Sequence, residues 1–441
     1  MAGGTFTTKN KKRPGAYINF KAVIKSLFGV SDRGIATMPL VLPWGEEDTI
    51  IPVTSEDLVS GKSLSKIGLT AADGNIFLNE CLKHCFKLLV YKINSGGTKA
   101  TATSGALTVT AKCFGTLGNS LKVVIKANAG AFDVLTYLNG DLKDKQSKVS
   151  TVAELSANDW VNFSGEGALE AAAGIILAGG EDGEVQTTGF SSYFAKVKNE
   201  TFNVMGIPFT TPDVGEATEI FIRDLRENAG KKVQAVLSGY DSDYEGIIKV
   251  KSTQGYKVAD KTIDSTGLVA FVTGITAGAE VNESNTYREV TGATEIIGEL
   301  SEDSDIDEAL ENGWFILTRR SDGVIVCEQD INSLHTFTPE RTSDFSKNRV
   351  LRVLDEIGNT CKNVFEKSYI GKVTNNDIGR SLFKSDIIAY FKTLQGISAI
   401  SDFSAEDIEV IPGDGVDSIV VNLGAKPADS MEKLYMTVTV G

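Results

Sequence analysis

The sequence is poor in the residues and motifs that most enzymes use for catalysis. Its 441 residues include only two histidines, His84 and His335, and neither lies in a nucleophile or zinc-binding motif. No phosphate-binding loop of the form G-x-x-x-x-G-K-[ST] is present, and Glu170 stands where a dinucleotide-binding fingerprint has its third glycine. We therefore expect no enzyme activity and no cofactor. Paired acids such as those at 46–48 leave a carboxylate-only glycosidase open.

Long apolar runs are also missing. No stretch approaches the roughly 20 apolar residues that a membrane span needs. The basic start is not followed by an apolar core, so we expect neither a secretory signal nor membrane insertion. An odd number of scattered cysteines argues against a disulfide framework and for a reducing compartment. The cysteines are Cys81, Cys85, Cys113, Cys327 and Cys361.

Two short clusters could bind a metal, and in both the sequence favours a structural interpretation. Cys81, His84 and Cys85 can meet on one helical turn, but no second ligand pair follows at structural-zinc spacing. Three aspartates alternate in 302–308 as in a calcium loop, but Glu308 replaces the required glycine. We expect core cysteines in the first case and an acidic helix start in the second.

The net charge of −14 argues against nucleic acid as a partner, but the charge is unevenly distributed. Residues 1–25 carry six basic residues and no acids, so the remainder carries −20 (−14 minus +6). A basic arm on an acidic body suits docking onto another copy of the same chain, although a solvated tail remains an alternative. The basic residues are Lys9, Lys11, Lys12, Arg13, Lys21 and Lys25.

The pattern along the chain predicts an α/β (α+β) multidomain protein. A helix at 74–87 precedes an apolar strand at 88–93, and the same rhythm returns after residue 200. Between Gly-rich junctions, short alternating runs predict an inserted all-β domain at 99–187. The strands expected there are 107–114, 121–127 and 131–138. The later elements are strands 202–209, 232–239 and 246–252 and helices 213–229 and 265–279.

The last third of the chain contains a hairpin and two helices. Ser304 suits a helix N-cap and Gly313 the position after the helix end, and an Asp-Gly turn then predicts a hairpin. A long helix is expected at 344–369 and another at about 377–395. The outer face of the first contains Arg349, Arg352, Glu356, Asn359, Asn363 and Lys367.

Both chain ends read as strands without a local partner. Alternation predicts one strand at Ala16–Phe20 and one at Leu434–Val440. An unpaired edge favours aggregation in a monomer, but it can add to a neighbour's sheet. If both ends do so with different neighbours, the head-to-tail contacts generate helices or stacked rings.

The sequence resembles contractile tail sheath proteins of myophages, defective prophages and R-type phage-tail-like bacteriocins of Gram-positive bacteria. The resemblance covers essentially the whole chain and keeps the order of the family's segments. It rests on RPGAYINF, LTVTAKCFGTLGN, NDWVNFSGEGAL, AGGEDG, FILTRRSDGVIVCEQDINSLHTFTPERTSDFSKNRVLRVLDEI and KPADSMEKLYMTVTV.

The resemblance implies a structural subunit that polymerises as stacked six-fold rings around an inner tail tube. Contraction from a metastable extended state would drive the tube through a bacterial envelope. The partners implied are further copies of the chain, the tube protein, and baseplate and tail terminator proteins. Assembly would take place in the bacterial host cytoplasm, and the product would be part of a virion or tail-like particle. The sheath of a non-phage contractile injection system and a particle-associated carbohydrate hydrolase are the alternatives.

The resemblance also assigns roles along the chain. Strand exchange would use Ala16, Tyr17, Ile18, Asn19 and Phe20 at one end. At the other end it would use Leu434, Tyr435, Met436, Thr437, Val438, Thr439 and Val440. Candidate contacts to the tube are Arg349, Arg352, Glu356 and Lys367. The implied domains are a linking arm (1–20), a middle α/β domain (21–98 and 188–340), an outer β domain (99–187), an inner domain (341–430) and a linking strand (431–441).

Overall fold

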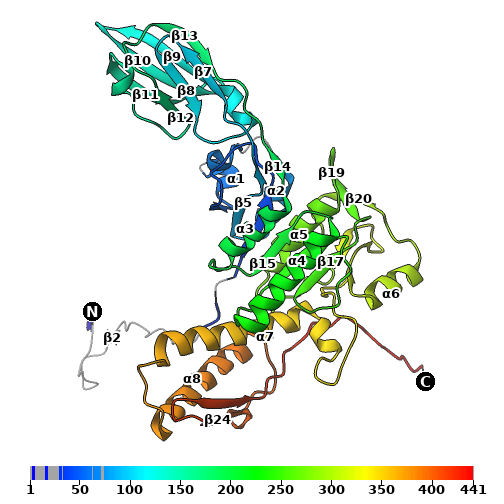
Figure 1. The fold of residues 1–441 in the computed structure, drawn as a ribbon. Coiled ribbons are helices and arrows are strands. Elements are labelled where there is room, and N and C mark those ends of the chain that lie inside the picture. Colours follow the sequence, from blue (N-terminus) through cyan, green and yellow to red (C-terminus); the bar gives the residue numbers. More distant parts are fainter. Residues whose placement is uncertain are drawn as a thin grey trace. The chain divides into compact units, whose positions relative to one another are not determined.

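The computed structural model describes residues 2–4, 15–17, 29–31, 33–61, 63–70 and 74–440. Its internal contacts divide the chain into two compact units. The first consists of Met1–Ser31 and Thr360–Lys426, and the second of Asp32–Asn359 and Pro427–Gly441. The predicted fold class, a multidomain protein of mixed helix and strand with an inserted all-β domain, is confirmed (Figure 1).

A seven-stranded sheet in the order β21-β17-β16-β15-β3-β5-β4 forms the centre of the second unit. All neighbours are parallel except β4, which runs antiparallel to β5 at one edge. Its central strands are almost wholly buried, as expected for a parallel sheet covered on both faces. The strands are β3 (Ile35–Leu40), β4 (Ile50–Thr54), β5 (Lys87–Lys92), β15 (Val204–Ile207), β16 (Gln234–Ser238), β17 (Ile247–Val250) and β21 (Trp314–Phe315).

Helices cover both faces of this sheet. One core contains side chains of α2 (Ile76–Leu82) and α5 (Ser265–Gly278). The core on the other face contains side chains of α3 (Thr187–Val197) and α4 (Pro212–Arg223). Helix α5 is buried on nearly every side, which explains its continuous apolar sequence. A five-residue π-helical turn, Asp224–Asn228, extends α4, and a short α1 (Asp57–Ser60) follows β4.

The inserted domain is a sandwich of a four-stranded sheet, β11-β10-β9-β13, and a three-stranded sheet, β12-β8-β7. Alternate side chains of both sheets enclose one core. The sequence predicted three of these strands and missed the others. For example, β11 buries only Val149, so it lacks an apolar alternation. The strands are β7 (Thr101–Ser104), β8 (Leu107–Ala111), β9 (Leu121–Asn128), β10 (Ala131–Leu138), β11 (Asp141–Val149), β12 (Val161–Ser164) and β13 (Ala172–Ile176).

The chain enters and leaves the sandwich through two neighbouring strands. Strand β6 (Asn94–Ser95) leads in, β14 (Glu184–Val185) leads out, and the two pair antiparallel. The side chain of Asn94 reinforces this junction, because its amide accepts from Leu42 N and donates to the carbonyl oxygens of Leu42 and Asp182.

Three antiparallel strands and a hairpin lie beside the main sheet. The strands are β18 (Gly255–Val258), β19 (Lys261–Ile263) and β20 (Ala293–Ile297). The predicted hairpin is present as β22 (Leu317–Arg319) and β23 (Ile325–Cys327). One expectation is wrong: α6 (Asp303–Glu311) begins before Ser304, after Glu302, whose side chain makes no cap bond. Gly313 follows this helix with a φ of 70°, as expected.

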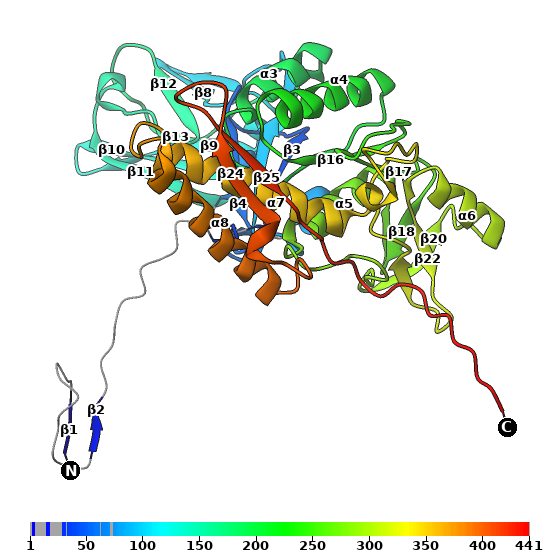
Figure 2. The same cartoon turned by 90° about the horizontal axis from the view of Figure 1, so that it is seen from below.

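The first unit contains the end of helix α7 (Asn348–Val364), its π-helical extension Phe365–Tyr369, and α8 (Asp377–Gly396). Rings of Phe365 and Tyr369 pack against Phe383 of α8. A two-stranded antiparallel ribbon, β24 (Ile408–Pro412) and β25 (Ile419–Leu423), completes the unit and buries Ile408 (Figure 2). The long helix was predicted from 344, but a separate 3-10 turn occupies Ser343–Ser346.

The partly buried His84 gives the second unit a testable pH dependence. Its ring packs edge-on against Phe271, and burial, aided by the nearby Arg288 charge, lowers its pKa to about 4. The unfolded chain binds this proton already near pH 6.5, so the free energy of unfolding should fall as the pH drops from about 6.5 towards 4. Urea unfolding at several pH values should show a smaller fall in His84→Gln than in the wild type. An equal fall in both would contradict this assignment.

Candidate assembly surfaces

The N-terminal strand has a local partner in the isolated chain, contrary to expectation. Strand β2 (Gly15–Tyr17) pairs in parallel with β1 (Ala2–Gly4), with Ala16 opposite Gly3 and Tyr17 opposite Gly4. A two-stranded pair of three residues each is marginal in water. The remaining residues of the predicted linking strand, Ile18, Asn19 and Phe20, lie outside the described residues.

The C-terminal segment Leu434–Val440 is not part of any sheet within the described residues. Its apolar side chains are strongly exposed, at 83% for Leu434, 73% for Met436 and 70% for Val438. Tyr435 and Val440 are exposed to 89%. A run of large apolar side chains in water points to a surface that another molecule covers. Whether that molecule is a second copy stays a prediction.

The base of this C-terminal segment is held on the second unit by Glu432. Its carboxylate accepts hydrogen bonds from the Lys347 ammonium at 2.5 Å and from the Thr286 hydroxyl at 2.7 Å. The Ser430 hydroxyl adds a third contact at 3.0 Å. Burial alone would raise the pKa of Glu432, but these bonds, chiefly that from Lys347, lower it. The carboxylate is therefore charged and paired at neutral pH.

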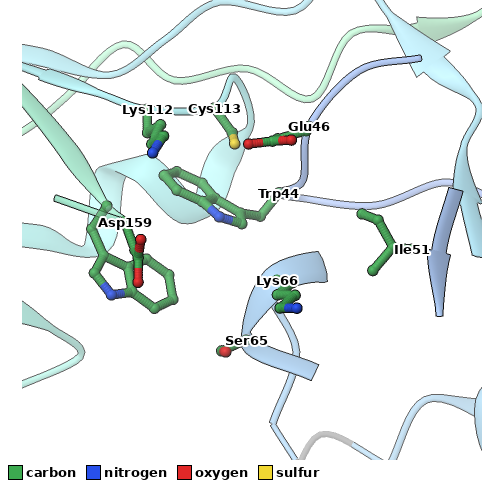
Figure 3. A pocket seen from close by; sticks show the side chains of 9 residues that line it. Trp44, Glu46, Ile51, Ser65, Lys66, Lys112, Cys113 and Asp159 are labelled. Carbon is green, nitrogen blue, oxygen red and sulfur yellow. The ribbon is translucent and has the colours of Figure 1, made fainter. Parts of the chain in front are cut away.

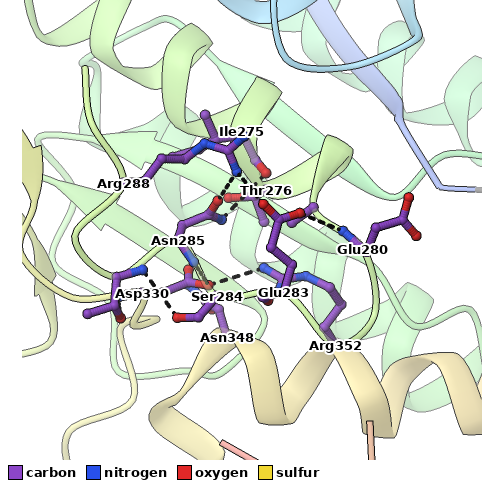
Figure 4. Close-up of polar contacts among 12 residues, drawn as sticks. Ile275, Thr276, Glu280, Glu283, Ser284, Asn285, Arg288, Asp330, Asn348 and Arg352 are labelled. Atoms are coloured by element: carbon purple, nitrogen blue, oxygen red, sulfur yellow. Dashed lines mark hydrogen bonds and ion pairs between the residues drawn. The ribbon is translucent and has the colours of Figure 1, made fainter. Parts of the chain in front are cut away.

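Thr286 connects this anchor to a buried polar network at the first half of α7. Figure 4 shows the members Asn285, Asp330, Asn348 and Arg352 of this network. The Thr286 hydroxyl accepts from Asp330 N, and the Asp330 carboxylate accepts from Asn285 N and the Asn348 amide. Arg352 donates to the Glu283 carbonyl at 2.6 Å and lies 3.3 Å from Asp330. These polar side chains hold α7 to the loop at 283–288.

This network corrects the predicted outer face of the helix. Arg352 and Glu356 are each only 2% exposed, so the expectation that they lie on an outer surface is wrong. Two-sided burial of α7 is the reason, and a polar packing surface looks like a solvent face in sequence. Arg349 is half-buried and Lys367 exposed, so a role in contacting a tube remains a prediction for these two.

The ribbon of β24 and β25 presents two sheet edges that no strand of the described chain covers. Gly413 N donates to Ser418 O, and Gly424 N donates to Asp407 O. Hydrogen-bonded pairs alternate in an antiparallel ladder, so these two bonds fix the direction of every backbone group between them. Ile419, Val421 and Leu423 point their N–H and C=O groups outward on β25. On β24 the outward set includes Pro412, which has no N–H.

The same ribbon carries a one-sided charge. Residues 393–425 contain six exposed acids and no lysine or arginine. Such a surface attracts a basic segment. The acids are Asp402, Glu406, Asp407, Glu409, Asp414 and Asp417.

The paired acids at 46–48, which left a carboxylate-only glycosidase open, lie beside two packed tryptophans. A pocket of about 470 Å³ contains Glu46 and Asp159 beside Trp44 and Trp160 (Figure 3). The ring centroids of the two indoles are 5.6 Å apart, and both side chains are buried. The two tryptophans therefore belong to the packed core and do not form an exposed platform on which a sugar could stack.

The cysteine cluster and the aspartates of 302–308 are likewise part of ordinary elements. Cys81 and Cys85 lie in the core with their sulfurs 3.6 Å apart, and the aspartates belong to the start of α6. Among the described residues, no group of three or more His, Cys, Asp or Glu side chains could hold a metal ion. Within the same residues no helix is both long and apolar enough to cross a membrane.

Four family models match successive parts of the chain and together span most of it. They describe a tail sheath protein Gp18 domain III N-terminal region (33–93) and a phage tail sheath protein beta-sandwich domain (95–182). A phage tail sheath protein central domain (183–333) and a phage tail sheath C-terminal domain (340–441) follow.

Whole-chain relatives agree with these models. The phage-like element PBSX protein XkdK of Bacillus subtilis is 35% identical over all of both chains. The crystal structure of the sheath tail protein of Desulfitobacterium hafniense is 41% identical and has a TM-score of 0.82, covering 96% of this chain and 99% of that one. The fold is also similar to the contracted helical sheath of the anti-feeding prophage, at 11% identity, a TM-score of 0.58 and coverage of 97% and 99%.

Proposed function

Because the chain belongs to the phage tail sheath protein family, it serves as a structural subunit of a contractile sheath, and we propose that its subunits are joined by strand exchange. They would stack as six-fold rings around an inner tail tube, with baseplate and tail terminator proteins at the ends. Two observations carry the proposal: the apolar side chains of Leu434–Val440 are exposed, and the ribbon of β24 and β25 has edges that no strand of the described chain covers.

The ribbon of β24 and β25 is the acceptor in this proposal. The outer edge of β25 offers a complete set of donors and acceptors at Ile419, Val421 and Leu423, as strand addition requires. The edge of β24 lacks a donor at Pro412 and is the poorer template. A third strand would also stabilise the ribbon, since two strands alone are marginal.

Charge supports the ribbon as the place where the N-terminal segment of a neighbour docks. Four basic residues, Lys9, Lys11, Lys12 and Arg13, directly precede Gly15–Tyr17. Residues 402–423 carry six exposed acids and no basic residue, and Lys426, which follows, lies 3.8 Å from one of them, Asp402. Opposite charges accelerate docking and disfavour a wrong partner. The weak pair of β1 and β2 would be given up for the longer contact.

Strand exchange fits a sheath that contracts without falling apart. Subunits can rotate as rigid bodies while backbone hydrogen bonds through short arms keep them linked. The work of contraction would come from the difference in interface free energy between two arrangements, with a kinetic barrier holding the extended one. In this proposal the sandwich at 99–187 lies outside, the region 341–430 faces the tube, and Arg349 and Lys367 are candidate tube contacts.

Val421→Pro tests the acceptor edge directly. The Val421 N–H points away from β24, so proline removes a donor needed by an added strand without removing a bond inside the ribbon. We expect soluble, folded protein and at least a ten-fold loss of sheath polymer, measured by sedimentation and negative-stain microscopy.

Val421→Thr is the matched control, because it keeps the β-branched shape and the N–H. It should polymerise as the wild type does. Normal tubes from folded Val421→Pro would show that β25 is not the acceptor. A non-phage contractile injection system would give the same tubes, and the particle isolated from the host separates that alternative.

A further inference from the structure

We infer that Glu432 is a positioning residue that docks the base of the C-terminal segment on its own subunit, so that only residues 433–441 extend towards a neighbour. Docking itself follows from contacts within one chain. Its consequence for assembly rests on the strand exchange proposed above.

The contacts of Glu432 differ from those of the rest of the segment. Its side chain is 12% exposed and is bonded to Lys347, Thr286 and Ser430. Met431 on one side is fully exposed, and so is most of Leu434 on the other. A surface pocket of about 540 Å³ is lined by Lys347 and residues 429–434. Among the described residues 431–440, Glu432 is the one that is not exposed.

The partners of Glu432 are themselves firmly placed. Lys347 directly precedes α7, and its neighbour Asn348 is fully buried and bonded to Asp330. Thr286 is bonded to Asp330 N in the same network. Both partners of the Glu432 carboxylate therefore belong to a buried hydrogen-bond network or lie next to it, which fixes where residue 432 docks.

Docking at this point sets how far the segment can reach. Residues 433–440, fully extended at about 3.3 Å each, span about 26 Å, whereas release back to Pro427 would extend this to about 46 Å. A longer tether lowers the effective concentration of the strand at its acceptor as roughly the −3/2 power of length. Release of the base would therefore lower the effective concentration of the strand about two-fold at each junction. A docked base therefore favours assembly by shortening the search.

Limited digestion with a glutamyl endopeptidase measures docking on the full chain. Cleavage after Glu432 releases the peptide 433–441, which mass spectrometry quantifies. When opening is fast, the rate of release follows the undocked fraction. Lys347→Met removes the charged partner, and we expect about ten-fold faster release, the lower end of what a charge-assisted hydrogen bond contributes.

Two variants serve as controls. Lys426→Met removes an exposed lysine near the same segment that does not contact Glu432, and it should release the peptide at the wild-type rate. Lys347→Arg keeps the charge and should restore slow release, which a nonspecific loss of folding would not. Equal rates in wild type, Lys347→Met and Lys426→Met would overturn the docked base.

A second measurement, the protein concentration needed to form polymer, tests whether docking of Glu432 affects assembly. Lys347→Met should require about two-fold more protein to form polymer, and an unchanged requirement would overturn the positioning role. If the strand-exchange hypothesis is wrong, Val421→Pro should form normal polymer, and the digestion rates of the Lys347 variants should still differ as expected. The two hypotheses therefore fail in different measurements.

Discussion

A chain lacking residues 1–20 is expected to fold normally and to form no sheath polymer. In the described structure the strands β1 and β2 pair only with each other, so their removal takes no strand from the seven-stranded sheet or the sandwich. The proposed link to the next subunit is lost entirely, along with four basic residues that would dock on the acidic ribbon. The thermal midpoint should change by less than about 2 °C, while pelleted polymer falls below detection.

The matched control for this deletion keeps the strand and removes only its charge. Replacing Lys9, Lys11, Lys12 and Arg13 by glutamine should slow assembly and make it less dependent on salt, but tubes should still form. Normal tubes from the truncated chain would contradict the assignment of the N-terminal segment. Failure of both variants to the same extent would indicate that charge, rather than strand pairing, supplies the contact.

Val438→Pro should abolish assembly while leaving the subunit soluble and folded. Residues 434–440 belong to no sheet in the described chain, so proline there disturbs no internal ladder. In an added strand, proline either removes a donor or clashes with the adjacent strand, and it cannot be accommodated in mid-sheet. Each junction should lose about 1–3 kcal/mol, and every subunit of the polymer carries such a junction. Sedimentation and electron microscopy provide the measurement.

Met436→Pro should behave in the same way, since both residues lie on one face of the strand. Thr437→Ala on the opposite face is the control, because it keeps the N–H and removes only an exposed hydroxyl and methyl group. Tubes that persist with proline at both 436 and 438 would remove the C-terminal segment from the assembly mechanism.

The α/β core was predictable from the sequence because a parallel strand buried on both faces is a mostly apolar run. The runs 88–93, 202–209 and 232–239 are mostly apolar, and each corresponds to a strand of the main sheet. Strand β11 is different, since it carries five lysines or aspartates at the edge of its sheet and has no alternation to detect. Trp314–Phe315 pairs with residues of β17 that are 65 positions earlier in the chain, which a local pattern cannot indicate.

The assembly surfaces were predictable only in part. Alternation identified Leu434–Val440, and the exposure of its apolar residues agrees with a segment awaiting a partner. Helical spacing placed Arg352 and Glu356 on an outer face, whereas the structure buries both, Arg352 against the loop at 283–288. A polar residue in a buried network and one in water have the same periodicity, so sequence alone cannot separate them. The role of Glu432 depends on partners 85 and 146 residues away.

The paired strands at Asn94–Ser95 and Glu184–Val185 make the sandwich a replaceable module. Its two connections to the body lie side by side, so a domain of any size can occupy this position without changing the path of the main chain. Among the buried residues of the sandwich core, Trp44 alone comes from outside the insertion. Substitutions within the sandwich can therefore accumulate without altering the strands of the seven-stranded sheet.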